Sequence, residues 1–222
     1  MKIPVFNVLI SPDNFYRTVI NEKESLKIPC MIVIAGAIIS SIYAYMIGGL
    51  TGKLMGAMMP GLSTIIELST LIGAFIATFI IWVVMTAIFF GLSCLFKGQG
   101  SFRRCLEMTG YGYLPQVIGS VVTLIAAFVY VPKIVVPEVS AAALQDPQQI
   151  QEVIKALMQQ PAMVELTQIT AVISIVFLLW SANSWIFGMR YARGLSMRNA
   201  AICVGVPVII YVLYMAYSIA GV

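Results

Sequence analysis

IIELSTLIGAFIATFIIWVVMTAIFFGLSCLF, residues 65–96, is an apolar run whose one charged residue is Glu67. A helix needs about 20 residues to cross the hydrocarbon core of a bilayer, so this run can span a membrane and still tilt or project beyond it. Gly73 with Ala77, and Ala74 with Thr78, place small residues four apart, which favours close packing of helices. The run therefore predicts a long transmembrane helix.

Four further apolar runs, at residues 28–50, 112–131, 169–188 and 199–220, are also long enough to cross. The 222-residue chain is 60% hydrophobic and 10% charged, more apolar than one soluble domain of this size could bury. The runs are continuous rather than alternating, which favours helices over a β-barrel. We therefore expect an all-α polytopic membrane protein, with residues 1–222 forming a single bundle of five transmembrane helices.

Two amphipathic segments flank these spans. In residues 1–27, Ser11 and Pro12 resemble a helix start, and an apolar face follows at Phe15, Tyr16, Val19 and Ile20. This pattern predicts a short helix at the membrane interface, which either docks a soluble partner or anchors the first span. In the loop 132–168, an apolar stripe from Ile150 to Met158 predicts a helix that covers the outer mouth of the bundle or lies on the outer leaflet.

Basic residues are distributed unevenly among the loops. Ten of the 13 Lys and Arg residues lie in the N-terminal segment, the second loop and the fourth loop, all on one side of the five spans. The positive-inside rule predicts a cytoplasmic N-terminus and an external C-terminus in the cell membrane. The expected cytoplasmic basic surface includes Arg17, Lys97, Arg103, Arg104, Arg190, Arg193 and Arg198.

Such a surface suits the anionic inner leaflet, so membrane lipids are the expected partners. A cytoplasmic protein and a second copy of the chain are further candidate partners. The net charge of +4 gives no reason to expect nucleic acid.

The composition also removes most enzyme classes. The chain has no histidine, which excludes Ser-His catalysis, and its four cysteines show no C-x-x-C spacing for a metal. The acidic residues are scattered over loops and span ends, and no phosphate-binding GxxxxGK[ST] loop is present. We therefore expect neither enzymatic activity nor a metal or other cofactor.

Polar residues inside the spans are the remaining candidates for a site, because they usually face the interior of a bundle. Gln116 and Asn183 each lie about five residues, or ~7–8 Å, from the expected cytoplasmic ends of their spans. We expect the third and fourth spans to be neighbours and these two amides to face each other, as an interhelical hydrogen bond or as the lining of a polar cavity. Glu67 is either an interfacial residue or a third member of that cavity.

Three segments resemble a known family. These are SPDNFYRTV (11–19), GSFRRCLEMTGYGYLPQVIG (100–119) and RGLSMRNAAICVGVPVII (193–210). They are similar to the pre-span segment, the loop into the third span and the last loop of the Yip domain membrane proteins, which are named in eukaryotes for interacting with Ypt and Rab GTPases. The most recognisable part of the resemblance is Gly110, Tyr111, Gly112, Tyr113 and Pro115.

The resemblance implies five spans with a cytoplasmic N-terminus. Eukaryotic members carry a long N-terminal region with an Asp-aromatic-Gly-Pro motif, whereas 27 residues precede the first span here, so GTPase binding does not follow and a short prokaryotic-type member is indicated. Two functions remain open. The first is a non-enzymatic membrane scaffold or adaptor that organises lipid or protein partners at its cytoplasmic face. The second is a small transporter or channel with a polar cavity near Gln116 and Asn183.

Overall fold

The structure is a computed structural model that describes residues 4–56, 61–137 and 147–220. Five of its helices are long and apolar enough to cross a membrane. Their bounds are α3 Lys27–Gly56, α4 Leu62–Leu95, α6 Leu114–Tyr130, α8 Pro161–Arg193 and α9 Met197–Ala220. The all-α, five-span prediction is confirmed, although α8 begins eight residues before the expected span.

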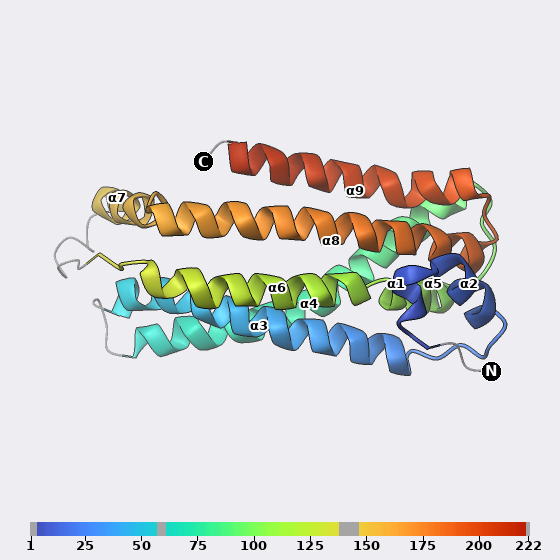
Figure 1. Ribbon diagram of the computed structural model, residues 1–222, viewed down its shortest axis with the longest axis horizontal. Helices are drawn as coiled ribbons and strands as arrows, with labels where there is room; N and C mark the ends of the chain where they lie inside the picture. Colours follow the sequence, from blue (N-terminus) through green and yellow to red (C-terminus); the bar gives the residue numbers. More distant parts are fainter. Residues whose placement is uncertain (1–3, 57–60, 138–146, 221–222) are drawn as a thin grey trace.

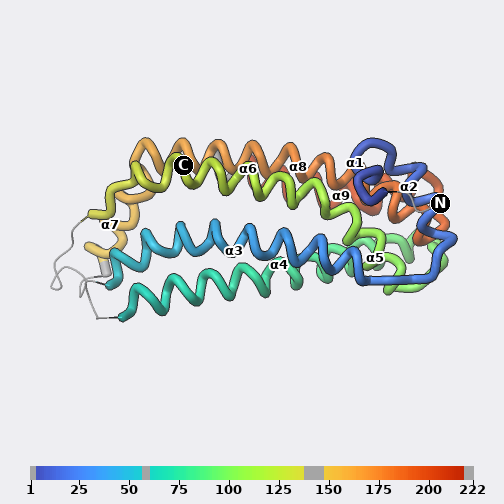
Figure 2. Tube along the Cα trace, turned by 60° about the horizontal axis from the view of Figure 1, so that its bottom comes forward, coloured from blue at the N-terminus to red at the C-terminus, as the bar shows by residue number. Residues whose placement is uncertain are grey.

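The long helices form two layers (Figures 1 and 2). α3 and α4 pack along each other in one layer, while α6, α8 and α9 follow one another in the second. α3 also contacts α6, which joins the layers. α6 and α8 are neighbours, so that prediction is confirmed. The helix faces turned away from the bundle carry exposed apolar side chains, for example Ile76, Ile80, Ile125, Val176 and Ile209. A bundle with such an outer surface is suited to lipid.

Three short helices gather at one end of the bundle, which we call the basic end. They are α1 Asn7–Ile10, α2 Pro12–Val19 and α5 Phe102–Tyr111. The predicted N-terminal helix is therefore present, with Pro12 in its first turn. Its apolar face packs on protein, because Phe15, Tyr16 and Val19 are buried in a cluster with residues of α5 and α8. α2 is thus an integral part of the bundle.

The opposite end is closed by the turn η1 Val131–Lys133 and helix α7 Pro147–Met158. Leu157 of α7 is buried in an apolar cluster with Leu50, Ile134, Met163 and Leu166. Pro161 then starts α8 at its first helical position, where proline loses no hydrogen bond. The predicted loop helix is confirmed, and Leu157 packs it against this end of the bundle.

Candidate functional site

The segment Gly110–Pro115 connects α5 to α6 and lies in the middle of the basic end. Its glycines are required by close packing. A Cβ on Gly110 would lie 2.6 Å from Cβ of Pro29, and one on Gly112 would lie 2.7 Å from Nε1 of Trp185. Pro115 is itself buried. We call this segment the junction. Because Gly110 and Gly112 carry no side chains, α3, α4 and α8 pack directly against it.

Buried hydrogen bonds fix this junction to α2 and α8. Tyr16 of α2 donates its hydroxyl hydrogen to the carbonyl of Met108 at 3.0 Å. A hydroxyl has one hydrogen, so Ser184, 3.1 Å away, is the donor to Tyr16. Trp185 donates through Nε1 to the carbonyl of Thr109 at 2.9 Å. Burial raises the pKa of Tyr16, which keeps its hydroxyl protonated as a donor.

Side-chain hydrogen bonds also join the C-terminal half of α5 to α4. Trp82 donates through Nε1 to the hydroxyl of Thr109 at 3.3 Å, and the hydroxyls of Thr86 and Thr109 are 2.6 Å apart. All three side chains are buried. α5 is therefore held by both layers of the bundle.

An ion pair holds the chain that enters α3. Arg104 donates to Glu107 at 2.7 Å, and the other carboxylate oxygen of Glu107 accepts from the backbone N–H of Ser25 at 3.2 Å. Arg104 also donates to the carbonyl of Glu22 and lies 3.8 Å from the carboxylate of Glu24. Burial raises the pKa of Glu107 above its usual value, and the hydrogen bonds from Ser25 and Arg104 partly oppose that rise.

Arg193 at the end of α8 is also internal, with 4% of its surface exposed. It donates to Ser93 at 2.8 Å and to the carbonyl of Gly98 at 2.7 Å, as well as to the carbonyl of Gly100. Its guanidinium stacks 4.2 Å from the centre of the Phe90 ring. Arg193 therefore clamps the α4–α5 connection to α8 and is not available to a partner.

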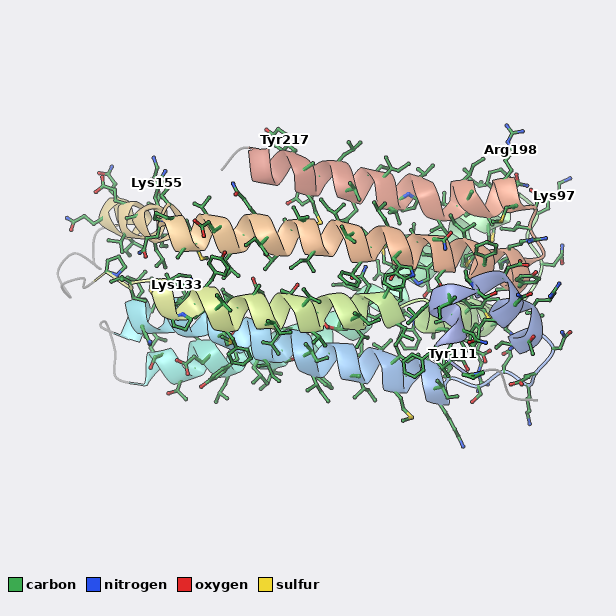
Figure 3. All side chains as sticks on the ribbon, in the orientation of Figure 1. Lys97, Tyr111, Lys133, Lys155, Arg198 and Tyr217 are labelled. Carbon is green, nitrogen blue, oxygen red and sulfur yellow. The ribbon has the colours of Figure 1, made fainter. Side chains whose placement is uncertain are left out.

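Two of the seven predicted surface cations, Arg193, which is buried, and Arg104, whose side chain is 11% exposed, are thus bound within the fold, and this corrects the prediction for both. Arg190 is half exposed and pairs with Asp13 of α2 at 3.1 Å. The other four, Arg17, Lys97, Arg103 and Arg198, are exposed and pair with no carboxylate among the described residues. Lys97 and Arg198 lie at the basic end, and Lys133 and Lys155 at the opposite end (Figure 3).

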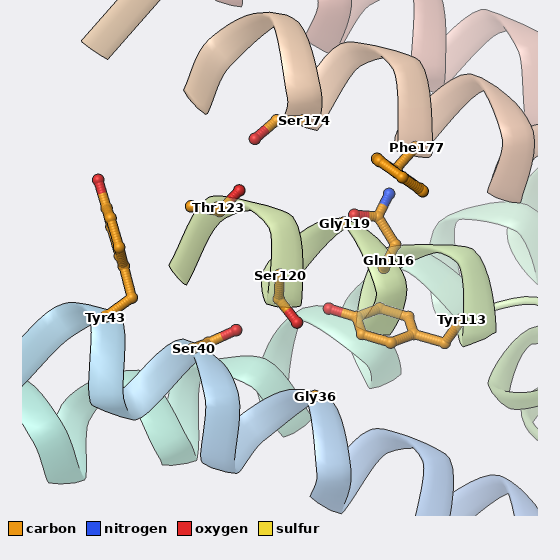
Figure 4. A pocket seen from close by; sticks show the side chains of 10 residues that line it. All are labelled: Gly36, Ser40, Tyr43, Tyr113, Gln116, Gly119, Ser120, Thr123, Ser174 and Phe177. Atoms are coloured by element: carbon orange, nitrogen blue, oxygen red, sulfur yellow. The ribbon is translucent and has the colours of Figure 1, made fainter. Parts of the chain in front are cut away.

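A polar cavity of about 230 Å³ lies between α3, α6 and α8 (Figure 4). Ser40 and Tyr43 line it from α3, and Ser174 with Phe177 from α8. The α6 side carries its remaining polar side chains, which are Tyr113, Gln116, Ser120 and Thr123. Tyr113 belongs to the junction segment, so the junction reaches the cavity directly.

Residues 6–219 match the Yip1 domain. The chain belongs to the Yip1 domain family. It is also 30% identical over 124 residues to an uncharacterized protein of Methanocaldococcus jannaschii, a match that covers 56% of this chain and 88% of that one. No solved structure matches the chain. The resemblance read from the three motif segments is therefore confirmed, and this Yip1 domain is a multi-pass membrane protein.

The structure separates the three residues that were expected to share the cavity. Gln116 lines it, but Asn183 does not, and Asn183 is exposed. Asn183 is nine residues from Ser174 along α8, a rotation of about 180°, so it points away from the cavity. Glu67 lies near Lys53 and Tyr45 at the opposite end of the bundle. The expected pairing of Gln116 with Asn183 is wrong.

Ser181 is the polar side chain of α8 that faces α6 at this level. The close contacts of Gly112 with Trp185 and of Gly119 with Phe177 fix the register of these antiparallel helices. Ser181 lies midway between Phe177 and Trp185, and its hydroxyl is buried without a hydrogen-bond partner among the described residues. The sequence signal for it was its spacing of four from each of those two aromatic residues.

No group of three or more His, Cys, Asp or Glu side chains in the described part of this Yip1 domain could hold a metal ion. The four cysteines are free. Burial raises the pKa of Cys105 to about 12, which keeps that thiol unreactive.

Proposed function

We propose that this Yip1 domain is a non-enzymatic membrane scaffold, whose basic end faces the cytoplasm and gathers anionic lipids there. The proposal rests on the difference between the acidic and the basic residues at this end: most of the acids are paired within the chain, and most of the exposed cations are not. At the basic end, Asp13, Glu24 and Glu107 are each paired with an arginine of the same chain, which leaves Glu22 as the one carboxylate outside such a pair among the described residues of that end.

Six exposed cations surround this packed core without a carboxylate partner in the described chain. They are Arg17, Lys23, Lys27, Lys97, Arg103 and Arg198. Because three of the four described carboxylates at this end are paired with arginines, the exposed surface of the basic end carries a strong positive charge. Each Lys or Arg near an anionic membrane surface contributes about 1 kcal/mol of attraction. The contacts of Arg104 and Arg193 hold the connections beside Lys23 and Lys97 against the bundle.

The experiment compares two matched charge-removal variants. One carries Lys97→Gln, Arg103→Gln and Arg198→Gln at the basic end, and the other carries Lys53→Gln, Lys133→Gln and Lys155→Gln at the opposite end. All six side chains are exposed. Each protein is reconstituted in vesicles of phosphatidylglycerol and phosphatidylcholine, and the lipids retained after purification are measured by native mass spectrometry. We expect the first variant to lose its preference for phosphatidylglycerol several-fold and the second to keep it. Equal retention by wild type and the basic-end variant would contradict the proposal.

Solute permeation is a second candidate, favoured by the polar cavity between α3, α6 and α8. Protein-containing and empty liposomes separate the two functions. Selective flux above the empty-vesicle background would overturn the scaffold proposal, whereas lipid retention without flux would support it.

A further inference from the structure

The polar cavity contains hydrogen-bonding groups that the protein itself does not use. Ser40, Tyr113, Gln116 and Thr123 form no side-chain hydrogen bond with any other described residue. An unsatisfied polar group inside an apolar membrane bundle costs several kcal/mol. Four such groups around one space therefore require either water or a ligand that hydrogen-bonds them.

The remaining polar groups of the cavity are already oriented by their own helices. Ser120 donates to the carbonyl of Val117 at 2.8 Å, and Ser174 donates to that of Thr170 at 2.7 Å. The oxygens of Ser120 and Ser174 consequently turn lone pairs, rather than hydrogens, to further partners. The cavity thus offers acceptors on fixed hydroxyls and both donors and acceptors on the amide of Gln116.

The cavity ends inside the bundle. It extends from Tyr113, just before α6, to Thr123, which is ten residues or about 15 Å along the helix axis. Beyond that level the same three helices close around the apolar cluster of Leu50, Met163 and Leu166. A polar space with an apolar plug at one end has the form of a binding site, not of a continuous pore.

The lining also restricts the charge of an occupant. All the side chains that line the cavity are uncharged. An ion would lose its hydration there without a counter-charge, whereas a neutral molecule loses only hydrogen bonds that the lining can replace. The volume of about 230 Å³ is below the roughly 300–1,000 Å³ of pockets for drug-sized ligands. The rings of Tyr43, Tyr113 and Phe177 offer apolar surface to the carbon skeleton of such a molecule.

We propose that this cavity is a binding site for a small, uncharged, hydroxyl-rich molecule of the polyol class. Gln116 is its central recognition group, because its amide supplies two donors and an acceptor from one side chain. The molecule is either free polyol or the glycerol head of a neutral lipid, since both present the same hydroxyl groups. The site is separate from the cationic surface, and its occupant needs no anionic lipid.

The test uses a Ser120→Cys variant in a background with Cys30, Cys94, Cys105 and Cys203 replaced by alanine. Ser120 lines the cavity but bonds its own helix, so the change leaves the four unused groups intact. The protein is placed in phosphatidylcholine nanodiscs, and its rate of modification by a small uncharged methanethiosulfonate is measured. Glycerol and monooleoylglycerol are tested separately as protecting molecules. A Ser196→Cys variant, at an exposed position after α8, is the matched control.

We expect the Ser120→Cys variant to be modified, and one of the two protecting molecules to slow that modification at least threefold; which one does so identifies the source of the polyol. Sucrose at equal viscosity should not protect, because it is too large for the cavity. Adding Gln116→Leu should abolish the protection, and the Ser196→Cys control should not respond. Absence of modification at position 120, absence of protection by both molecules, equal protection by sucrose, or protection that survives Gln116→Leu would each overturn the proposal.

Discussion

Replacing Gly112 by alanine should destabilise the whole basic end, because the new methyl group has no space. Its Cβ would lie 2.7 Å from Nε1 of Trp185 and 3.1 Å from the hydroxyl oxygen of Tyr16. Neither neighbour can retreat freely. Trp185 is bonded to the carbonyl of Thr109 at 2.9 Å, and Tyr16 to that of Met108 at 3.0 Å.

The expected loss follows from these contacts. Overpacking a filled core costs about 1–3 kcal/mol, and loss of one of the two hydrogen bonds adds about 1 kcal/mol. Gly112 has φ −69° and ψ −3° as the C-cap of α5, so alanine suffers no backbone strain there and gains little helix propensity. We expect Gly112→Ala to lower the free energy of unfolding by about 2–4 kcal/mol.

Gly91→Ala is the matched control. Gly91 lies inside α4, and a Cβ there would meet no atom within 4 Å. This change should stabilise the protein by up to about 1 kcal/mol through helix propensity. Unfolding by sodium dodecyl sulfate in mixed micelles, followed by circular dichroism, measures both variants. If Gly112→Ala unfolds at the same detergent fraction as wild type, the junction is not close-packed and the reasoning fails.

Three further predictions concern the charges and amides of the bundle. Arg193→Lys should lower the free energy of unfolding by about 1–3 kcal/mol, because an ammonium cannot reach Ser93, Gly98 and Gly100 together. As the control, Arg103→Lys at an exposed position should change the free energy of unfolding by less than about 0.5 kcal/mol. Equal effects of the two changes would show that Arg193 does not clamp the α4–α5 connection. Burial raises the pKa of Glu107, so the folded protein retains that proton to a higher pH than the unfolded chain does. The stability of wild type relative to Glu107→Gln should therefore fall as pH rises from about 4.5 to the folded-state pKa. Denaturation at several pH values measures this difference, and a rise in relative stability over that range would contradict the prediction. Asn183→Leu should change the free energy of unfolding by less than about 0.5 kcal/mol or increase it, since the exposed amide has no partner among the described residues. A decrease of more than about 1 kcal/mol would indicate that Asn183 lies inside the bundle.

The five spans could be predicted from sequence because apolar length alone determines whether a helix can cross a membrane. α5 was missed because its ten residues carry polar and charged side chains and resemble a loop. A signal was nevertheless present at Ser101, which is the N-cap of α5 and accepts a hydrogen bond from the backbone N–H of Arg104 at 3.0 Å.

The candidate site could be predicted only in part. Gln116 was found because polar residues in spans tend to face inward. Asn183 was misplaced because the depth of a residue along a helix does not determine which way its side chain points around the helix axis. The contacts of Phe177 and Trp185 with the glycines of α6 and the junction fix the rotation of α8, and they turn Ser181 toward α6. Counting charges likewise could not reveal that Arg193 is buried and Arg104 mostly buried, since both bind backbone carbonyls that are distant in sequence and that only the fold brings together.

The sidedness of the basic end tests the proposed scaffold most directly, because anionic lipids can be gathered at the inner leaflet only if that end is cytoplasmic. Single cysteines in place of Gln151 in α7 and Ser196 after α8 mark the two ends, and both positions are exposed. Intact cells expressing each variant without its native cysteines are treated with a membrane-impermeant maleimide. We expect Gln151→Cys to be labelled in intact cells and Ser196→Cys only after the cells are permeabilised. Labelling of Ser196→Cys but not of Gln151→Cys in intact cells would contradict the account.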